Sequence, residues 1–341
     1  MALLLAGACS SSTGELDRVE DFRQRATQYY EAADLLRAEQ QARRGLQLDP
    51  DHSMLNLILG RTLLRHRDLQ SVVKAFPYLQ KAYDREEDYR TGLSLGEAHL
   101  RYSEFLIGEA ANLEERAGQL GEGEEKDAEE MRTRATHARE QADQRLKRAL
   151  SLLEQSRDAA PSFTFTLQLL ASCYAHLNRW EDSLATLKKL EGILVESRRF
   201  KNQQLALRDL PLWQEDRLRE ELKRDLKMEE DSRGLAATIY MENQRWEAAE
   251  EELGEILKLD PDLDQEYYNR GYCRYQLGKL APAAEDMLHF LRKTHLGYDT
   301  EEVARALDIV SEFRAATGAG PLELPSSPPP SLPAENGSGS P

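Results

Sequence analysis

The residues that could perform chemistry are scattered along the chain. No serine lies in the Gly-x-Ser-x-Gly motif of a nucleophile, and no glycine-rich loop has phosphate-binding spacing. The acidic run at 122–130 lacks the spacing of a calcium loop. Seven histidines occur without the HExxH spacing of a zinc site, at positions 52, 66, 99, 137, 176, 289 and 295. The sequence therefore predicts no catalytic residue, no cofactor and no metal, and it predicts that the protein is not an enzyme.

One cysteine lies where its thiol could be modified. Residues 1–8 form a short run of apolar and small residues, and Cys9 and three serines follow. This segment resembles the end of a bacterial lipoprotein signal peptide, in which the signal is cleaved before a cysteine that then carries lipid. The resemblance implies lipidation of Cys9, and Ser10 after it implies an outer-membrane protein facing the periplasm. The segment departs from the family at Ala6, where leucine is usual, and no basic residue precedes the apolar run.

Composition favours helices and restricts the partners. Charged residues make up 31% of the 341 residues, and the formal net charge of −16 repels phosphate backbones, so we expect no nucleic-acid binding. No apolar run approaches the roughly 20 residues of a membrane-spanning helix. A membrane is therefore expected as a partner only through a lipid anchor at Cys9.

Small residues recur with one period at both ends of the chain. Repeat starts at Val19 and Ser53 are 34 residues apart, and so are those at Glu230 and Asp264. A further match starts at Thr164. The small residues at the eighth position of these repeats are Ala26, Gly60, Ala171, Ala237 and Gly271.

This pattern resembles the tetratricopeptide repeat, a helix–turn–helix unit of 34 residues. The resemblance implies an all-α fold, a right-handed superhelical solenoid of antiparallel helix pairs. Small residues allow the two helices of a pair to approach closely, and each pair buries its open face against its neighbour. The second repeat fits only if its turn near 66–68 is about three residues longer than usual.

The repeats are interrupted, and this sets the domain organisation. Residues at about 100–141 are strongly helical, and we expect a protruding helical hairpin there. The predicted segments are a signal-like N-terminus and tether (1–16), repeats with that hairpin (17–197), a helical linker or degenerate repeat (198–229), two repeats plus a capping helix (230–317), and a disordered Pro/Ser/Gly tail (318–341).

In the tetratricopeptide repeat family, fixed positions of the first helices face a peptide in a concave groove. The resemblance therefore implies a partner-binding groove lined by Arg61, Gln168, Ser172, Tyr268, Asn269, Tyr272 and Tyr275. An alternative is that Tyr268 and Tyr272 pack against the capping helix. Asn269 alone resembles the Lys/Asn clamp of members that bind chaperone tails, so that function is not implied.

The resulting hypothesis is a non-catalytic scaffold of the bacterial cell envelope that binds a protein or peptide partner. The alternative is a soluble cytoplasmic adaptor or regulator with the same repeats and no lipid anchor. An enzyme would require titratable groups that meet in a pocket, and their spacing in the sequence does not predict such a cluster.

Overall fold

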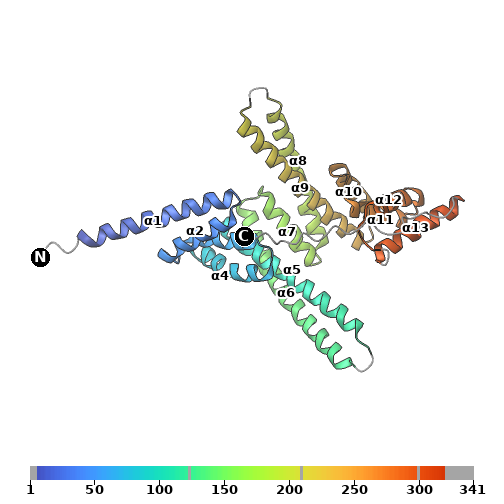
Figure 1. Cartoon of the computed structure of the whole chain (residues 1–341), viewed down its shortest axis with the longest axis horizontal. Helices are drawn as coiled ribbons and strands as arrows, with labels where there is room; N and C mark the ends of the chain where they lie inside the picture. The colour runs from blue at the N-terminus through green and yellow to red at the C-terminus, as the bar shows by residue number, and fades with distance from the viewer. Residues whose placement is uncertain (1–5, 122–123, 208–209, 298–299, 319–341) are drawn as a thin grey trace, which may run out of the picture. The chain divides into compact units, whose positions relative to one another are not determined.

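The computed structural model describes residues 6–121, 124–207, 210–297 and 300–318, with side chains from residue 16 onward. Within these ranges the chain forms thirteen α-helices and no strand (Figure 1). The prediction of an all-α fold is confirmed. None of the helices in this part of the chain combines the length and the apolar character needed to cross a membrane.

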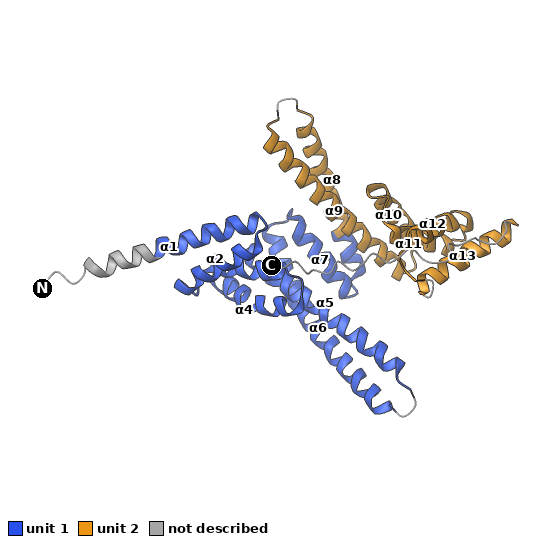
Figure 2. Cartoon of the chain, in the orientation of Figure 1, with its two compact units in different colours: residues 1–186 blue, residues 187–341 orange. Residues whose placement is uncertain are grey.

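The chain divides into two compact units, residues 1–186 and 187–341 (Figure 2). The first unit contains α1 (Ala6–Glu31), α2 (Leu35–Leu48), α3 (Ser53–Leu64), α4 (Leu69–Arg85), α5 (Tyr89–Gln119), α6 (Glu125–Ala159), α7 (Thr164–His176) and the start of α8 (Trp180–Leu205). The second contains the rest of α8, then α9 (Leu212–Glu242), α10 (Trp246–Leu259), α11 (Asp264–Gln276), α12 (Leu280–Lys293) and α13 (Glu301–Thr317). Three of these helices, α3, α7 and α11, begin at the repeat starts predicted from the sequence.

The turn inside each repeat has the same backbone geometry. The fifteenth residue of five repeats has a positive φ of 56–72°. These residues are Ala33, Arg67, Asn178, Gln244 and Gly278. In four of the five repeats, the next amide donates to the carbonyl five residues earlier, as Arg245 does to Tyr240 at 2.8 Å. This left-handed residue ends the first helix and reverses the chain, so the second helix returns antiparallel to the first.

The second repeat differs from its sequence-based description. Its turn, 65–68, contains its left-handed residue, Arg67, at the usual position, so the expected three-residue lengthening of the turn is wrong. The additional residues lengthen α4, which has 17 residues where α2 has 14. Val72 is fully buried where the other repeats have a small residue, and this substitution misled the alignment.

Close helix approach at the eighth position is visible in the same repeat. A Cβ atom on Gly60 would overlap the side chain of Leu79 on α4. Leu79 is completely buried and belongs to a core formed by α1 to α4 with residues of α5 and α6. Glycine at this position therefore leaves room for the Leu79 side chain against the backbone of α3.

Two helix pairs are longer than a repeat requires. Helices α5 and α6 extend beyond α4 as a hairpin of the first unit, in agreement with the expected hairpin at about 100–141 (Figure 1). Its outer interface consists of small and medium apolar side chains, among them Leu106, Ala110, Ala135 and Ala138. The residues 122 and 123 of its connecting turn lie outside the described part of the chain.

The second long pair, α8 and α9, covers the segment 198–229 that was predicted to be a linker or a degenerate repeat. Charged side chains join its helices: Arg198 contacts Glu229 at 2.5 Å, and Lys201 contacts Asp225 at 2.7 Å. Arg233 on α9 pairs with Glu191 on α8. Ion pairs also join α5 to α6, Arg139 to Glu114 and Arg134 to Glu109, but their side chains are exposed. The ion pairs of α8/α9 are more deeply buried.

The segments predicted at the two ends of the chain, 1–16 and 318–341, are only partly described by the structure. Helix α1 begins at Ala6, so residues 6–16 have a helical backbone where an N-terminal tether was expected. The side chain of Cys9 is not among those described. At the other end, Gly318 closes α13 with a left-handed conformation, φ 68°, and the predicted tail from 319 onward lies outside the described residues.

Candidate functional site

The structure distributes the predicted groove residues between the two units. Arg61, Gln168 and Ser172 belong to the first unit, where each is half-buried on the first helix of its repeat. The guanidinium carbon of Arg61 lies 5.0 Å from the centre of the Tyr30 ring. These three side chains keep part of their surface open to solvent.

The predicted tyrosines of the second unit all contact the capping helix α13 or its core. Tyr268 is only 6% exposed and packs on Phe290, and its hydroxyl accepts a hydrogen bond from Arg305 at 3.3 Å. Arg305 also lies over the ring of Tyr272, at 5.1 Å. The Tyr275 hydroxyl donates to Glu312 at 2.9 Å. Burial of Tyr268 leaves no ring surface for a partner, so the packing alternative describes this residue.

Asn269 lies next to these tyrosines but points to its own helix. Its amide donates to the carboxylate of Glu266, one turn earlier on α11, at 3.1 Å. This short-range hydrogen bond accounts for its orientation.

Two cysteines are buried in the repeat cores. Burial raises the pKa of both Cys173 and Cys273 to about 12, so neither thiol ionises near neutral pH. Cys173 instead donates a hydrogen bond to the carbonyl of Leu146 at 3.3 Å. Both act as small apolar residues of the interior.

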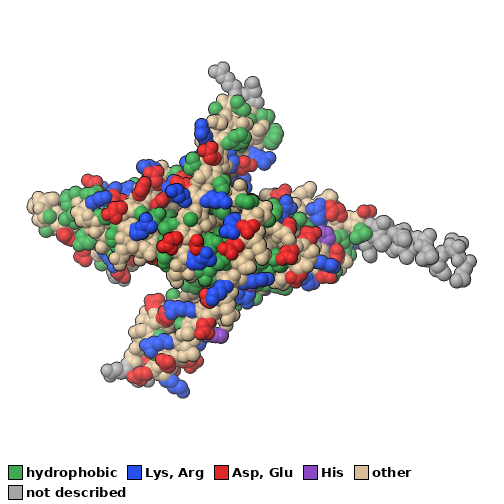
Figure 3. Space-filling model, turned by 180° about the vertical axis from the view of Figure 1, so that it is seen from behind, with side chains coloured by type: hydrophobic (Ala, Val, Ile, Leu, Met, Phe, Trp, Pro, Cys, Tyr) green, Lys and Arg blue, Asp and Glu red, His purple; other side chains and the backbone are tan. Residues whose placement is uncertain are grey.

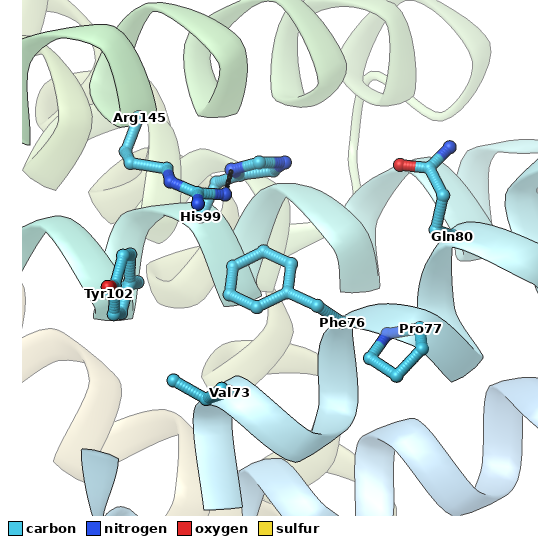
Figure 4. A pocket seen from close by; sticks show the side chains of 7 residues that line it. All are labelled: Val73, Phe76, Pro77, Gln80, His99, Tyr102 and Arg145. Carbon is cyan, nitrogen blue, oxygen red and sulfur yellow. Dashed lines mark hydrogen bonds between the residues drawn. The ribbon is translucent and has the colours of Figure 1, made fainter. Parts of the chain in front are cut away.

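A pocket that the sequence did not predict lies at the base of the α5/α6 hairpin (Figure 4). Its volume is about 390 Å³, which is in the range of small ligand sites. Side chains from three helices line it. These are Val73, Phe76, Pro77 and Gln80 of α4, His99 and Tyr102 of α5, and Arg145 of α6.

Arg145 is held in this pocket by aromatic rings. Its guanidinium lies over Phe76 at 5.0 Å and over Tyr102 at 4.9 Å. Phe76 in turn makes edge contacts with the rings of His99 and Tyr102. Stacking fixes the guanidinium plane while leaving N–H groups at its edge for hydrogen bonds.

His99 completes the polar side of the pocket as a neutral group. Burial, followed by the charges of Arg145 and Arg148, lowers the pKa of His99 to about 4. Its Nδ1 atom lies 3.4 Å from Arg145 (Figure 4). Because a guanidinium only donates, Nδ1 is the acceptor, and the proton of the neutral ring is on Nε2.

A second surface is found at the outer end of the α8/α9 hairpin. Four large apolar side chains are exposed there: Phe200 at 60%, Leu207 at 56%, Leu212 at 77% and Trp213 at 67%. Figure 3 shows hydrophobic side chains gathered toward the end of this hairpin. We call these four residues the apolar tip. Among the described residues, the α5/α6 hairpin has no large apolar side chain with comparable exposure.

Neither the pocket nor the apolar tip was predicted as a site from the sequence. The pocket residues are separated by up to 72 positions, from Val73 to Arg145, and only the packing of α4, α5 and α6 brings them together. For the apolar tip, the sequence does show large apolar residues, Leu212 and Trp213, directly after a proline. Helical periodicity alone does not predict whether they are buried or exposed.

Comparison with known proteins supports the repeat description for part of the chain. Residues 237–308 match the family model of the tetratricopeptide repeat. The comparison with curated proteins found no match.

Several solved structures are similar to the chain. A thermophilic tetratricopeptide repeat protein from Thermus thermophilus is 17% identical over 75% of this chain and 98% of that chain, with a TM-score of 0.43. A tetratricopeptide repeat protein from Parabacteroides merdae is 12% identical over 89% and 88%, with a TM-score of 0.46. The assembly chaperone of RpL4 is 18% identical over 78% and 99%, with a TM-score of 0.37.

These TM-scores are all below 0.5, so the assignment rests on the family match and on the repeat register. The match covers α10, α11 and α12, together with parts of α9 and α13. It includes both left-handed turn residues of the second unit, Gln244 and Gly278, which are 34 residues apart. Residues 237–308 are therefore similar to tetratricopeptide repeats.

Proposed function

We propose that this chain is a non-catalytic scaffold that binds a protein partner, and that the apolar tip of α8/α9 is a main contact surface. Tetratricopeptide repeat proteins generally mediate protein–protein interactions. The observation that carries the proposal is the exposure of Phe200, Leu207, Leu212 and Trp213 on one hairpin end. Contiguous exposed apolar side chains mark interaction sites, and Trp is enriched among the residues that dominate binding energy.

The design of the hairpin also supports a binding role. Ion pairs such as Arg198–Glu229 and Lys201–Asp225 join its two helices along their length. These ion pairs hold the two helices together, while the apolar side chains at the hairpin end stay exposed. A rigid helical arm with an apolar end suits insertion into a hydrophobic groove of another protein.

An affinity pull-down from the native cells tests this proposal. We expect the full-length chain to recover a specific protein, and the double substitution Leu212→Ser and Trp213→Ser to abolish recovery. The matched control is Glu129→Ser with Glu130→Ser on the α5/α6 hairpin, which should leave recovery unchanged. Equal recovery by the tip variant and the wild-type chain would contradict the role of the tip.

We further propose that the open part of the repeat groove contributes to binding. The half-buried side chains Arg61, Gln168 and Ser172 support this, because each keeps part of its surface accessible on a first helix. Substitution Gln168→Ala should weaken capture of the partner by a smaller factor than loss of the tip, because its contact is polar and partly solvated.

We also propose that the scaffold belongs to the bacterial cell envelope and is anchored by lipid at Cys9. The support is the apolar run followed by Cys9 and serines. Labelling of cells with a palmitate analogue should mark the wild-type chain and not the Cys9→Ser variant. If both forms fractionate alike with the soluble proteins, the cytoplasmic adaptor is the correct alternative.

A further inference from the structure

The pocket at the base of the α5/α6 hairpin contains a cation without a counter-ion. Arg145 makes aromatic contacts with Phe76 and Tyr102 and one contact with neutral His99. No described carboxylate forms an ion pair with Arg145 or with Arg148, one turn later on α6. In a chain of net charge −16, this leaves a local positive site beside an apolar wall.

The polar groups of the pocket are hydrogen-bond donors and suit a ligand that carries an acceptor. The edge of the stacked Arg145 guanidinium and the Nε2–H of neutral His99 both offer hydrogen-bond donors. Across the pocket, the amide of Gln80 donates to Asp84 at 2.7 Å, so this carboxylate is already engaged on α4. Carboxylates bind arginine through two parallel hydrogen bonds and are the natural ligand for such a set of donors.

The remaining wall of the pocket is apolar. Val73, Phe76 and Pro77 of α4 form it, and Val73 is exposed to solvent. The volume of about 390 Å³ accommodates more than a single carboxylate. A ligand that fills the pocket therefore needs an apolar group next to its negative charge.

We propose that this pocket binds an acidic side chain of the protein partner together with an apolar side chain adjacent to it. The carboxylate contacts Arg145, and the apolar neighbour lies against Val73, Phe76 and Pro77. The inference rests on the proposed scaffold function and assigns the chemistry of one contact within it. The pocket belongs to α4, α5 and α6, and it includes none of the residues expected to line the repeat groove.

Fluorescence polarisation with the full-length chain tests this directly. The probes are labelled, C-terminally amidated octapeptides in which one Glu or Asp is flanked by Leu or Phe, with Gly and Ser elsewhere. We expect saturable binding of at least one probe, and at least a tenfold loss when its acidic residue is replaced by the corresponding amide. A free C-terminal carboxylate on the amide peptide should not restore binding, because the proposal assigns a side-chain carboxylate.

The protein variants separate this contact from general effects of charge. Arg145→Gln should weaken binding of the acidic probe at least tenfold, so that this probe binds no more tightly than its amide form. Arg145→Lys should restore binding only partly, because an ammonium lacks the planar edge. The control, Arg132→Gln on the exposed face of the same helix, should bind as the wild-type chain does.

The outcomes are decisive in both directions. Absence of binding by every probe up to millimolar concentration, or equal binding by the acidic and amide forms, would overturn the inference. A folded Arg145→Gln variant that binds the acidic probe like the wild-type chain would also overturn it. If the pull-down partner is then still lost on substitution of Leu212 and Trp213, the proposed function stands without this contact.

Discussion

At the scale of single residues, the turns share a left-handed conformation at the fifteenth repeat position and differ in the residue that adopts it. Gly278 adopts its left-handed conformation without a Cβ, whereas Arg67 and Gln244 adopt it with one. A left-handed backbone costs a residue with a Cβ about 1 kcal/mol relative to glycine. Glycine inside a helix has the opposite effect, because it increases the entropy lost on folding.

The same substitution should therefore change stability in opposite directions at two glycines of the second unit. Gly278→Ala should lower the free energy of unfolding by about 1 kcal/mol, because φ is +72° there. Gly254→Ala lies inside α10 with open space around the added methyl, and it should raise stability by about 0.5–1 kcal/mol. Urea denaturation measures both, and equal signs would contradict the assigned turn geometry.

His99 gives a pH dependence whose sign follows from its burial. Its pKa in the folded chain is about 4, below the ordinary value of 6.5, so the unfolded chain binds a proton in this interval that the folded chain does not. Stability contributed by neutral His99 is complete above pH 6.5 and is lost as the pH falls toward 4. The full loss amounts to about 3 kcal/mol.

We expect His99→Gln to remove this part of the acid destabilisation. Urea denaturation at pH 7 and at pH 4.5 measures the stability that each chain, wild-type and variant, loses over this interval. If the two chains lose the same stability over this interval, His99 is not the buried neutral group described above.

At the scale of helices, the two hairpins should respond differently to loss of charge. The α8/α9 pair depends on Arg233, which contacts Glu191, Glu229 and Glu252. Glu229 is almost completely buried, and burial raises the pKa of Glu252 above its usual range in spite of Arg233. Removal of the cation would leave Glu252 without an ion-pair partner and Glu229 with Arg198 alone, and the loss of a buried partner costs several kcal/mol.

Arg233→Leu should therefore destabilise the second unit by about 3–5 kcal/mol. Glu252 without Arg233 has a pKa raised further above its unfolded value, so the folded variant binds a proton more readily than the unfolded one. The loss of stability in the Arg233→Leu variant, relative to the wild-type chain, should accordingly grow as the pH rises above about 4.5. Stability measured at pH 5 and pH 8 checks the sign, and a deficit that shrinks with rising pH would contradict it.

The helices were predictable from the sequence to different degrees. The starts of α3, α7 and α11 followed from the 34-residue register, because small residues at the eighth position report close helix packing. The turn of the second repeat was misplaced, because Val72 occupies a position where a small residue was sought. The hairpin α5/α6 was predictable from length and helical composition alone.

The candidate sites were much less accessible to sequence reasoning. Tyr268 lay at a groove position of the family pattern, but its burial depends on α13, which supplies Arg305 and closes the surface. The pocket around Arg145 required knowledge of how α4 packs against α5 and α6. A local sequence pattern does not show whether an arginine has a carboxylate beside it in the folded chain.

At the scale of the whole molecule, repeat arrays transmit damage only to neighbouring helices. In the second unit, buried Asp286 of α12 accepts hydrogen bonds from Arg270 and Arg274 of α11 at 2.8–2.9 Å. This cluster is separate from the core that α1 to α6 form in the first unit. A change at Asp286 should therefore leave the first unit intact.

Hydrogen exchange of the Asp286→Ala variant tests this independence. We expect faster exchange in α11, α12 and α13, because two arginines lose their buried partner, and unchanged exchange in α3 and α4. A uniform increase along the whole chain would show that the two units unfold as one.

The most direct test of the scaffold account is a photo-crosslink from the apolar tip in living cells. The full-length chain is made with Trp213→benzoylphenylalanine, and a second form carries the same group at the exposed Glu129 of the α5/α6 hairpin. We predict a covalent adduct with one defined protein from position 213 and none from position 129. No protein adduct from position 213, or the same adducts from both positions, would contradict it.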